Sequence, residues 1–125
     1  MIVHVLRFGF ADETTHDEIA AIEAALRRLA ATEPVAFSVV GQDLGDPAEG
    51  FTLSYCVAFD DLAALEHYML HEPSHKEADF LIMPRVARMA AVDVTDDDDP
   101  ALRATVGELW QRRIAGDPEL AALFG

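Results

Sequence analysis

Cysteine is almost absent from this chain of 125 residues, in which Cys56 is the only one. A single cysteine excludes a disulfide within the chain and is typical of a reducing compartment, so we expect a cytoplasmic location. Long apolar runs are also missing, because none approaches the roughly 20 residues of a membrane span. The first residues form a strand-like pattern without a basic stretch ahead of an apolar segment, which predicts no signal peptide.

Basic residues are scarce as well. The chain has nine Lys and Arg against 23 Asp and Glu, which gives a formal charge of −14. Nucleic acids and anionic lipids are normally bound through clustered cations, so this balance argues against both kinds of partner. The acidic run at residues 96–99 is interpreted as a source of solubility.

Apolar residues make up 51% of the chain, and its length suffices for one domain with a single core. Residues rich in β-branched and aromatic side chains predict four strands, over 2–10, 35–44, 51–59 and 86–94. A capping box of Thr15 and Glu18 begins a helix that ends before Pro34, a second helix begins near Leu62, and Pro73 separates it from a short helix over 75–83.

The order of these elements is β-α-β-β-α-β, which predicts an α+β, ferredoxin-like domain over residues 1–95 with a four-stranded antiparallel sheet. Helices on one face of the sheet leave the other face uncovered. Side chains on that face are small or apolar, namely Val3, Val5, Ser54, Cys56 and Ala58. Such a face needs a partner, so we expect a homodimer whose two sheets pack face to face.

Residues 96–125 form a separate segment, an acidic linker followed by a helical C-terminal extension. Helical spacing of apolar residues predicts a helix that ends at Gly116 and a final turn that carries Leu123 and Phe124. The helix is amphipathic, and its apolar positions are Leu102, Val106, Leu109, Trp110 and Ile114. We expect the extension to dock on its own domain or to reach across the dimer.

Three segments carry a family resemblance. Residues 1–8 form a first strand with a histidine and an Arg-Phe pair, residues 51–65 combine an aromatic-Thr strand with a Phe-Asp helix start, and residues 68–75 read Tyr-Met-Leu-His-Glu-Pro-Ser-His. Together they resemble the stress responsive A/B barrel (Dabb) family of dimeric α/β barrels over residues 1–95. The chain departs from the family at Leu53, where the family has a histidine, and at Glu72, an extra residue in the His-Pro-x-His segment.

The resemblance also implies a site. Some plant members of the family close polyketide rings by aldol chemistry without metal or cofactor, and they use histidine and tyrosine as acid and base. His4, Tyr68 and His75 correspond to such positions, in a cleft between the sheet and the helices. The same comparison leaves room for a non-catalytic homodimer that binds a small ligand or has a stress-related role.

The residues themselves keep alternatives open for each catalytic candidate. His4 is either a proton carrier or a hydrogen-bonded core histidine. His75 lies near a helix start, where the helix dipole favours the neutral base, but it could instead cap the short helix. Tyr68 could donate to a developing enolate oxygen or simply pack.

Further residues are candidates for contact with a small apolar ligand or for ordinary core packing, namely Leu53, Tyr55, Phe8, Phe37 and His71. His67, His71 and His75 have a four-residue spacing that can bind metals, but Pro73 interrupts the helix between the last two. We therefore expect no metal, and the family resemblance implies no cofactor. The leading hypothesis is a cofactor-free acid/base enzyme that acts on a small apolar carbonyl compound.

Overall fold

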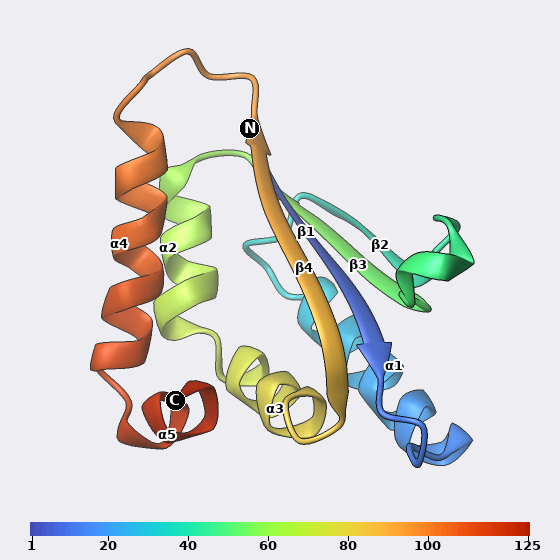
Figure 1. Cartoon of the computed structure of the whole chain (residues 1–125). Helices are drawn as coiled ribbons and strands as arrows, with labels where there is room; N and C mark the ends of the chain where they lie inside the picture. Colours follow the sequence, from blue (N-terminus) through green and yellow to red (C-terminus); the bar gives the residue numbers. More distant parts are fainter.

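The computed structural model describes all residues 1–125. The sheet consists of β1 (Ile2–Phe10), β2 (Phe37–Gln42), β3 (Leu53–Phe59) and β4 (Val86–Thr95), and a short 3₁₀ helix, η1 (Pro47–Glu49), lies between β2 and β3. The helices are α1 (His16–Ala30), α2 (Leu62–His71), α3 (Pro73–Ile82), α4 (Leu102–Ala115) and α5 (Pro118–Phe124). The element order confirms the predicted α+β, ferredoxin-like fold with helices after the last strand (Figure 1).

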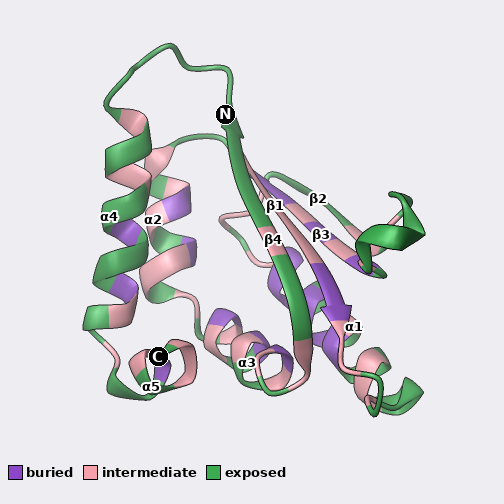
Figure 2. Cartoon of the chain, in the orientation of Figure 1, coloured by how far each residue is buried: buried purple, intermediate pink, exposed green.

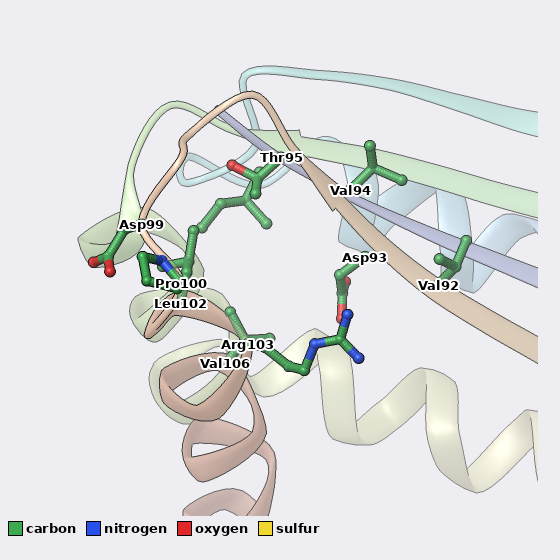
Figure 3. A pocket seen from close by; sticks show the side chains of 10 residues that line it. Val92, Asp93, Val94, Thr95, Asp99, Pro100, Leu102, Arg103 and Val106 are labelled. Atoms are coloured by element: carbon green, nitrogen blue, oxygen red, sulfur yellow. The ribbon is translucent and has the colours of Figure 1, made fainter.

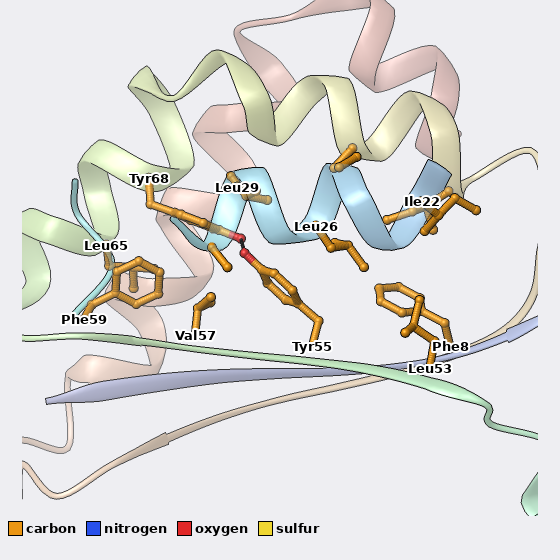
Figure 4. Close-up of a cluster of buried hydrophobic side chains, with 14 of the residues drawn as sticks. Phe8, Ile22, Leu26, Leu29, Leu53, Tyr55, Val57, Phe59, Leu65 and Tyr68 are labelled. Atoms are coloured by element: carbon orange, nitrogen blue, oxygen red, sulfur yellow. Dashed lines mark hydrogen bonds between the residues drawn. The ribbon is translucent and has the colours of Figure 1, made fainter. Parts of the chain in front are cut away.

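The strands form one antiparallel sheet in the order β2-β3-β1-β4, with the helices on one face (Figure 1). In the register, Phe8 pairs with Leu53 and Leu6 with Tyr55, so these side chains share the helix-covered face. That face carries the core, which Figure 4 shows between the sheet and α1 and in which Phe8, Tyr55, Val57 and Phe59 are buried.

Local sequence signals explain where the helices begin. Thr15 accepts a hydrogen bond from the Glu18 amide (3.1 Å), and the Glu18 carboxylate accepts one from the Thr15 amide (3.0 Å), which completes the predicted capping box. Pro73 occupies the first position of α3, and the Glu72 carboxylate accepts a hydrogen bond from the Ser74 amide (3.2 Å). The chain changes direction at the break between α2 and α3. His75 lies in the first turn of α3, on the side that faces the sheet, and is buried there.

The opposite face of the sheet is apolar and uncovered within the chain. Phe37, Val39, Val92 and Val94 are about half exposed or more, and Figure 2 shows β4 as largely exposed. Arg7 occupies one end of this face, where it donates two hydrogen bonds to Asp43 (2.7 and 3.0 Å). Most of the remaining area is therefore apolar surface in contact with water.

The C-terminal extension returns from the end of β4 and packs against its own chain. Helix α4 lies beside α2 (Figure 1), and Arg112 forms an ion pair with Glu66 of α2 (3.3 Å). At the start of α5, Asp117 pairs with Lys76 of α3 (2.8 Å). Of the two arrangements expected for the extension, the structure has the one in which it docks on its own domain. No helix in the chain is both long and apolar enough to cross a membrane.

Candidate functional site

A cavity of about 380 Å³ lies between the sheet and the helices. Its volume corresponds to about a dozen water molecules at about 30 Å³ each, which is the size range of small-molecule sites. Sixteen of its 22 lining residues are hydrophobic. Two of these sixteen are tyrosines, Tyr55 and Tyr68. The remaining lining residues include five titratable side chains, namely His4, His75, Asp79, Asp93 and Arg103. The cavity therefore brings together all three predicted catalytic residues, each from a different element.

His75 lies in the first turn of α3 and is only 7% exposed. Its Nδ1 donates to the carbonyl oxygen of Tyr68 (3.2 Å), which leaves Nε2 without the proton and without a partner in the chain. Burial, and then the charge of Arg113, hold the pKa of His75 well below its usual value. The side chain is thus neutral at pH 7, and burial rather than the helix dipole invoked from the sequence is the main cause.

Tyr68 is paired with Tyr55 through a hydrogen bond of 2.8 Å between their hydroxyl oxygens, drawn in Figure 4. Burial raises the pKa of both phenols, so both keep their protons at neutral pH. Because one hydroxyl donates to the other, the accepting hydroxyl retains a proton of its own. The pair can therefore offer one hydrogen bond to a ligand oxygen in the cavity.

His4, on β1, faces the cavity and lies opposite Asp93 of β4 in the strand register. Its Nδ1 is 2.6 Å from Asp93 Oδ1. A carboxylate only accepts hydrogen bonds, so Nδ1 carries the proton and Nε2 is free. This arrangement fixes the orientation of the imidazole and provides a negative charge beside any positive charge that the ring acquires.

Asp79 and Arg113 form an ion pair on the helix side of the cavity that the sequence did not reveal. Asp79 lies one turn after His75 on α3 and lines the cavity, whereas Arg113 comes from α4 and is only 4% exposed. Burial raises the pKa of Asp79, and Arg113 opposes this effect. Arg113 Nη1 is buried without a hydrogen-bond partner. The pairing joins residues 34 positions apart, so no local pattern could have found it.

The predicted ligand-contact residues divide into two groups. Tyr55 and Phe8 line the cavity, and Leu53 is buried in the core without reaching it. The expected contact by Phe37 is wrong, because Phe37 pairs with Ala58 in the register and lies on the uncovered face, 49% exposed. His71 is also outside the cavity, at the exposed end of α2 with its ring 6.0 Å from that of His67.

A second hollow, of about 510 Å³, adjoins the cavity where the linker leads from β4 into α4. Asp93, Arg103 and Val106 line both spaces. Figure 3 shows the guanidinium group of Arg103 directed toward Asp93 across the gap between α4 and β4. Arg103 is the only charged residue of the extension that lines the cavity, and Asp93 is the only one of β4.

The extension supplies an entire wall of the cavity. It contributes five lining residues, Arg103, Val106, Gly107, Trp110 and Phe124. Trp110 contacts Phe124 edge to face, with ring centroids 5.2 Å apart. The aromatic residues of the tail therefore line the space without filling it. No group of three or more His, Cys, Asp and Glu side chains lies close enough to hold a metal ion.

A small ferredoxin-like domain with a mainly apolar cavity between sheet and helices defines the general class of this protein. The family model of the stress responsive A/B barrel domain (Dabb) matches residues 2–96, and the chain belongs to this family. The extension lies beyond the matched residues, apart from its first position. Comparison with curated proteins gives no match.

Solved structures share the fold. A dimeric ferredoxin-like protein of unknown function from Thermobifida fusca YX is 28% identical, with a TM-score of 0.66 over 75% of this chain and 89% of that one. The hydroxynitrile lyase of Passiflora edulis is 20% identical, with a TM-score of 0.66 over 78% of this chain and 94% of that one. A Dabb family protein from Mesorhizobium loti is 19% identical, with a TM-score of 0.63 over 77% and 96%.

Proposed function

We propose that this protein is a cofactor-independent acid/base enzyme that acts on a small, apolar carbonyl compound, as in the cyclisation of a polyketide-like chain. The observation that carries the proposal is the convergence of His4, Tyr68 and His75 on one apolar cavity. Titratable groups with shifted pKa values that line a mostly apolar cavity are candidates for proton transfer to and from a ligand. The single cysteine fits a reducing cytoplasm, where we place the protein.

His75 is the base in this proposal. It is neutral at pH 7, and its free Nε2 can take a proton from the carbon next to a carbonyl group. The Tyr55–Tyr68 pair donates a hydrogen bond to the enolate oxygen that then develops. His4 is the second proton carrier, because its hydrogen bond to Asp93 (2.6 Å) orients the ring and leaves Nε2 free toward the cavity.

The fold is compatible with this chemistry. The Passiflora edulis neighbour is a hydroxynitrile lyase, an enzyme class that cleaves a carbon–carbon bond next to an oxygen that must lose or gain a proton. The Thermobifida fusca neighbour is dimeric, and the uncovered apolar sheet face supports a homodimer for this chain as well. Neither neighbour specifies the substrate of this chain.

A generic test uses 5-nitrobenzisoxazole, a small aromatic compound whose ring opens when a base removes one proton, releasing a coloured phenolate. Wild-type protein is expected to accelerate this reaction over buffer, and His75→Gln to lower kcat/KM at least tenfold. His67→Gln removes an exposed histidine of α2 and is the matched control, expected to retain the wild-type rate. Equal rates for the two variants would remove His75 as the base.

Small-ligand binding without catalysis is the alternative function. It is favoured by Leu53, which is buried in the core at the position where the family resemblance places a histidine. Mandelonitrile and aromatic ketones distinguish the two functions. Saturable binding with no turnover of mandelonitrile or nitrobenzisoxazole would support the alternative and contradict the acid/base proposal.

A further inference from the structure

The cavity-facing side of α4 has a glycine at its centre. Arg103, Val106, Gly107 and Trp110 are spaced three and four residues apart, so they form one stripe along the helix, and all four line the cavity. A Cβ atom built at Gly107 meets no atom within 4 Å. Gly107 is solvent-exposed and also lines the cavity, so a side chain added there would meet no protein atom and would stand beside the space that a ligand occupies.

Glycine is unfavourable at this place for the helix itself. Gly107 is the sixth residue of a helix of 14, far from both ends, and it does not have a positive φ. Alanine would be more stable there because it loses less backbone entropy on folding and adds no clash. Neither a positive φ nor a clash with a neighbouring side chain therefore requires glycine at this position.

The polar groups of the cavity lie on other elements. His4, Tyr55, Tyr68 and His75 come from β1, β3, α2 and α3, and the wall from α4 and α5 is apolar apart from Arg103. A ligand whose carbonyl group meets the histidines and tyrosines thus directs its apolar end toward α4. Trp110, supported edge to face by Phe124, provides an aromatic surface at that end.

We propose that Gly107 and Trp110 form a subsite for the apolar, ring-bearing end of the ligand, and that the missing side chain of Gly107 sets the size of the ring system that fits. The inference rests on the proposed function only in that it takes the same cavity as the ligand site. It makes the extension, beyond the residues that match the family, a determinant of specificity in this chain.

The test measures the affinities of two ketones that differ by one ring, acetophenone and 2-acetonaphthone. Trp110 is the only tryptophan of the chain, so quenching of its fluorescence reports binding at the subsite. Wild-type protein is expected to bind the naphthyl ketone more tightly. Gly107→Leu should lower affinity for the naphthyl ketone at least tenfold and affect acetophenone less, so the ratio of the naphthyl ketone affinity to the acetophenone affinity falls. Gly107→Ala should lower the same ratio by a smaller factor.

Ala104→Leu is the control, a slightly smaller increase in size on the same helix, also at an exposed position but one that does not line the cavity. It should leave both affinities unchanged, and circular dichroism verifies that each variant is folded. If Gly107→Leu fails to fold, the ratio for Gly107→Ala decides. An unchanged ratio in a folded Gly107 variant, or no saturable binding of either ketone to the wild type, overturns the inference.

Failure of the acid/base proposal has a different signature. If Gly107→Leu alters the ratio of affinities while His75→Gln leaves the elimination rate unchanged, the subsite stands and His75 is not the base. If His75→Gln abolishes the elimination while Gly107→Leu leaves the ratio intact, the base stands and the subsite does not exist.

Discussion

His75 and His4 line the same cavity in different electrostatic surroundings. His75 is buried near Arg113, and both burial and that positive charge disfavour a proton on its ring. His4 is partly exposed and bonded to the carboxylate of Asp93. Burial therefore holds His75 in its neutral form, whereas the hydrogen bond to Asp93 fixes the orientation of His4.

The burial of His75 predicts that the protein loses stability as the pH falls. The unfolded chain takes up a proton on this histidine near pH 6.5, whereas the folded chain takes it up only at lower pH. Below about pH 6.5 the unfolded state therefore binds more protons, and the free energy of unfolding declines by up to about 1.4 kcal/mol per pH unit for one such group. Urea unfolding between pH 5 and 7.5, at a constant protein concentration, measures this slope.

His75→Gln serves as the reference for that measurement, because glutamine does not titrate. The raised pKa of Asp79 acts in the opposite direction at lower pH, but it is present in both proteins and largely cancels in the difference. The slope of the variant should be shallower between pH 5 and 6.5. Identical slopes would mean that His75 is protonated as readily in the folded state as in the unfolded one.

Removing one partner of the buried Asp79–Arg113 ion pair is predicted to lower the stability of the folded protein strongly. Arg113→Met would leave the carboxylate of Asp79 buried without its partner, which costs about 3 to 5 kcal/mol in typical proteins. Arg112, the neighbour of Arg113 on α4, forms an exposed ion pair with Glu66 of α2. Arg112→Met removes this pair and should lower the free energy of unfolding by less than about 1 kcal/mol. Denaturant unfolding of both variants makes the comparison.

The double variant Asp79→Leu, Arg113→Met separates pairing from packing. Because it leaves no unpaired charge, it should recover much of the stability lost in Arg113→Met alone. A double variant that is less stable than Arg113→Met would show that Arg113 stabilises the helices through contacts other than the ion pair.

At the scale of the elements, the glycine of α4 predicts a measurable conflict between stability and binding. Gly107→Ala should raise the free energy of unfolding by about 1 kcal/mol, since alanine is the better helix former and the position is open. The reverse substitution on the same helix, Ala104→Gly, should lower it by a similar amount. Thermal unfolding followed by circular dichroism tests both, and a destabilised Gly107→Ala would indicate a contact that the structure does not show.

Local patterns in the sequence were sufficient for most of the elements. The capping box at Thr15, the alternation in β1 and the break at Pro73 each depend on neighbouring residues alone, and each was predicted correctly. Positions that depend on long-range pairing were not. The face on which Phe37 lies follows from its register against β3, and His71 lies exposed at the last position of α2.

The site itself was predictable only in part. His4, Tyr68 and His75 could be assembled through the family resemblance, and the structure places them around one cavity. Asp93 and Arg113 were not found, because the first reaches His4 across a strand pairing and the second reaches Asp79 from the extension. Ion pairs between distant residues leave no periodic signal in a single sequence. These charged residues could therefore be identified only from the three-dimensional structure.

At the scale of the whole molecule, the uncovered sheet face predicts a homodimer. Val92 and Val94 of β4 are each 54% exposed, and Val39 of β2 is more exposed still, so isolated chains would leave an apolar surface in water. Light scattering at micromolar concentration should therefore give about 27 kDa, twice the 13.7 kDa of one chain. The cavity opens on the other side of the sheet. A second copy that covers the apolar face therefore leaves one cavity in each protomer accessible.

Val92→Lys tests that arrangement, since it places a charge on the apolar face that two sheets would share, on the edge strand β4. Burying an unpaired ammonium group is costly enough to outweigh the gain from apolar contacts, so the variant should run as a folded monomer of about 13.7 kDa. Ala104→Lys adds the same charge on α4, on the helix side, and should remain dimeric. A dimeric Val92→Lys would mean that the chains associate through a surface other than this face of the sheet.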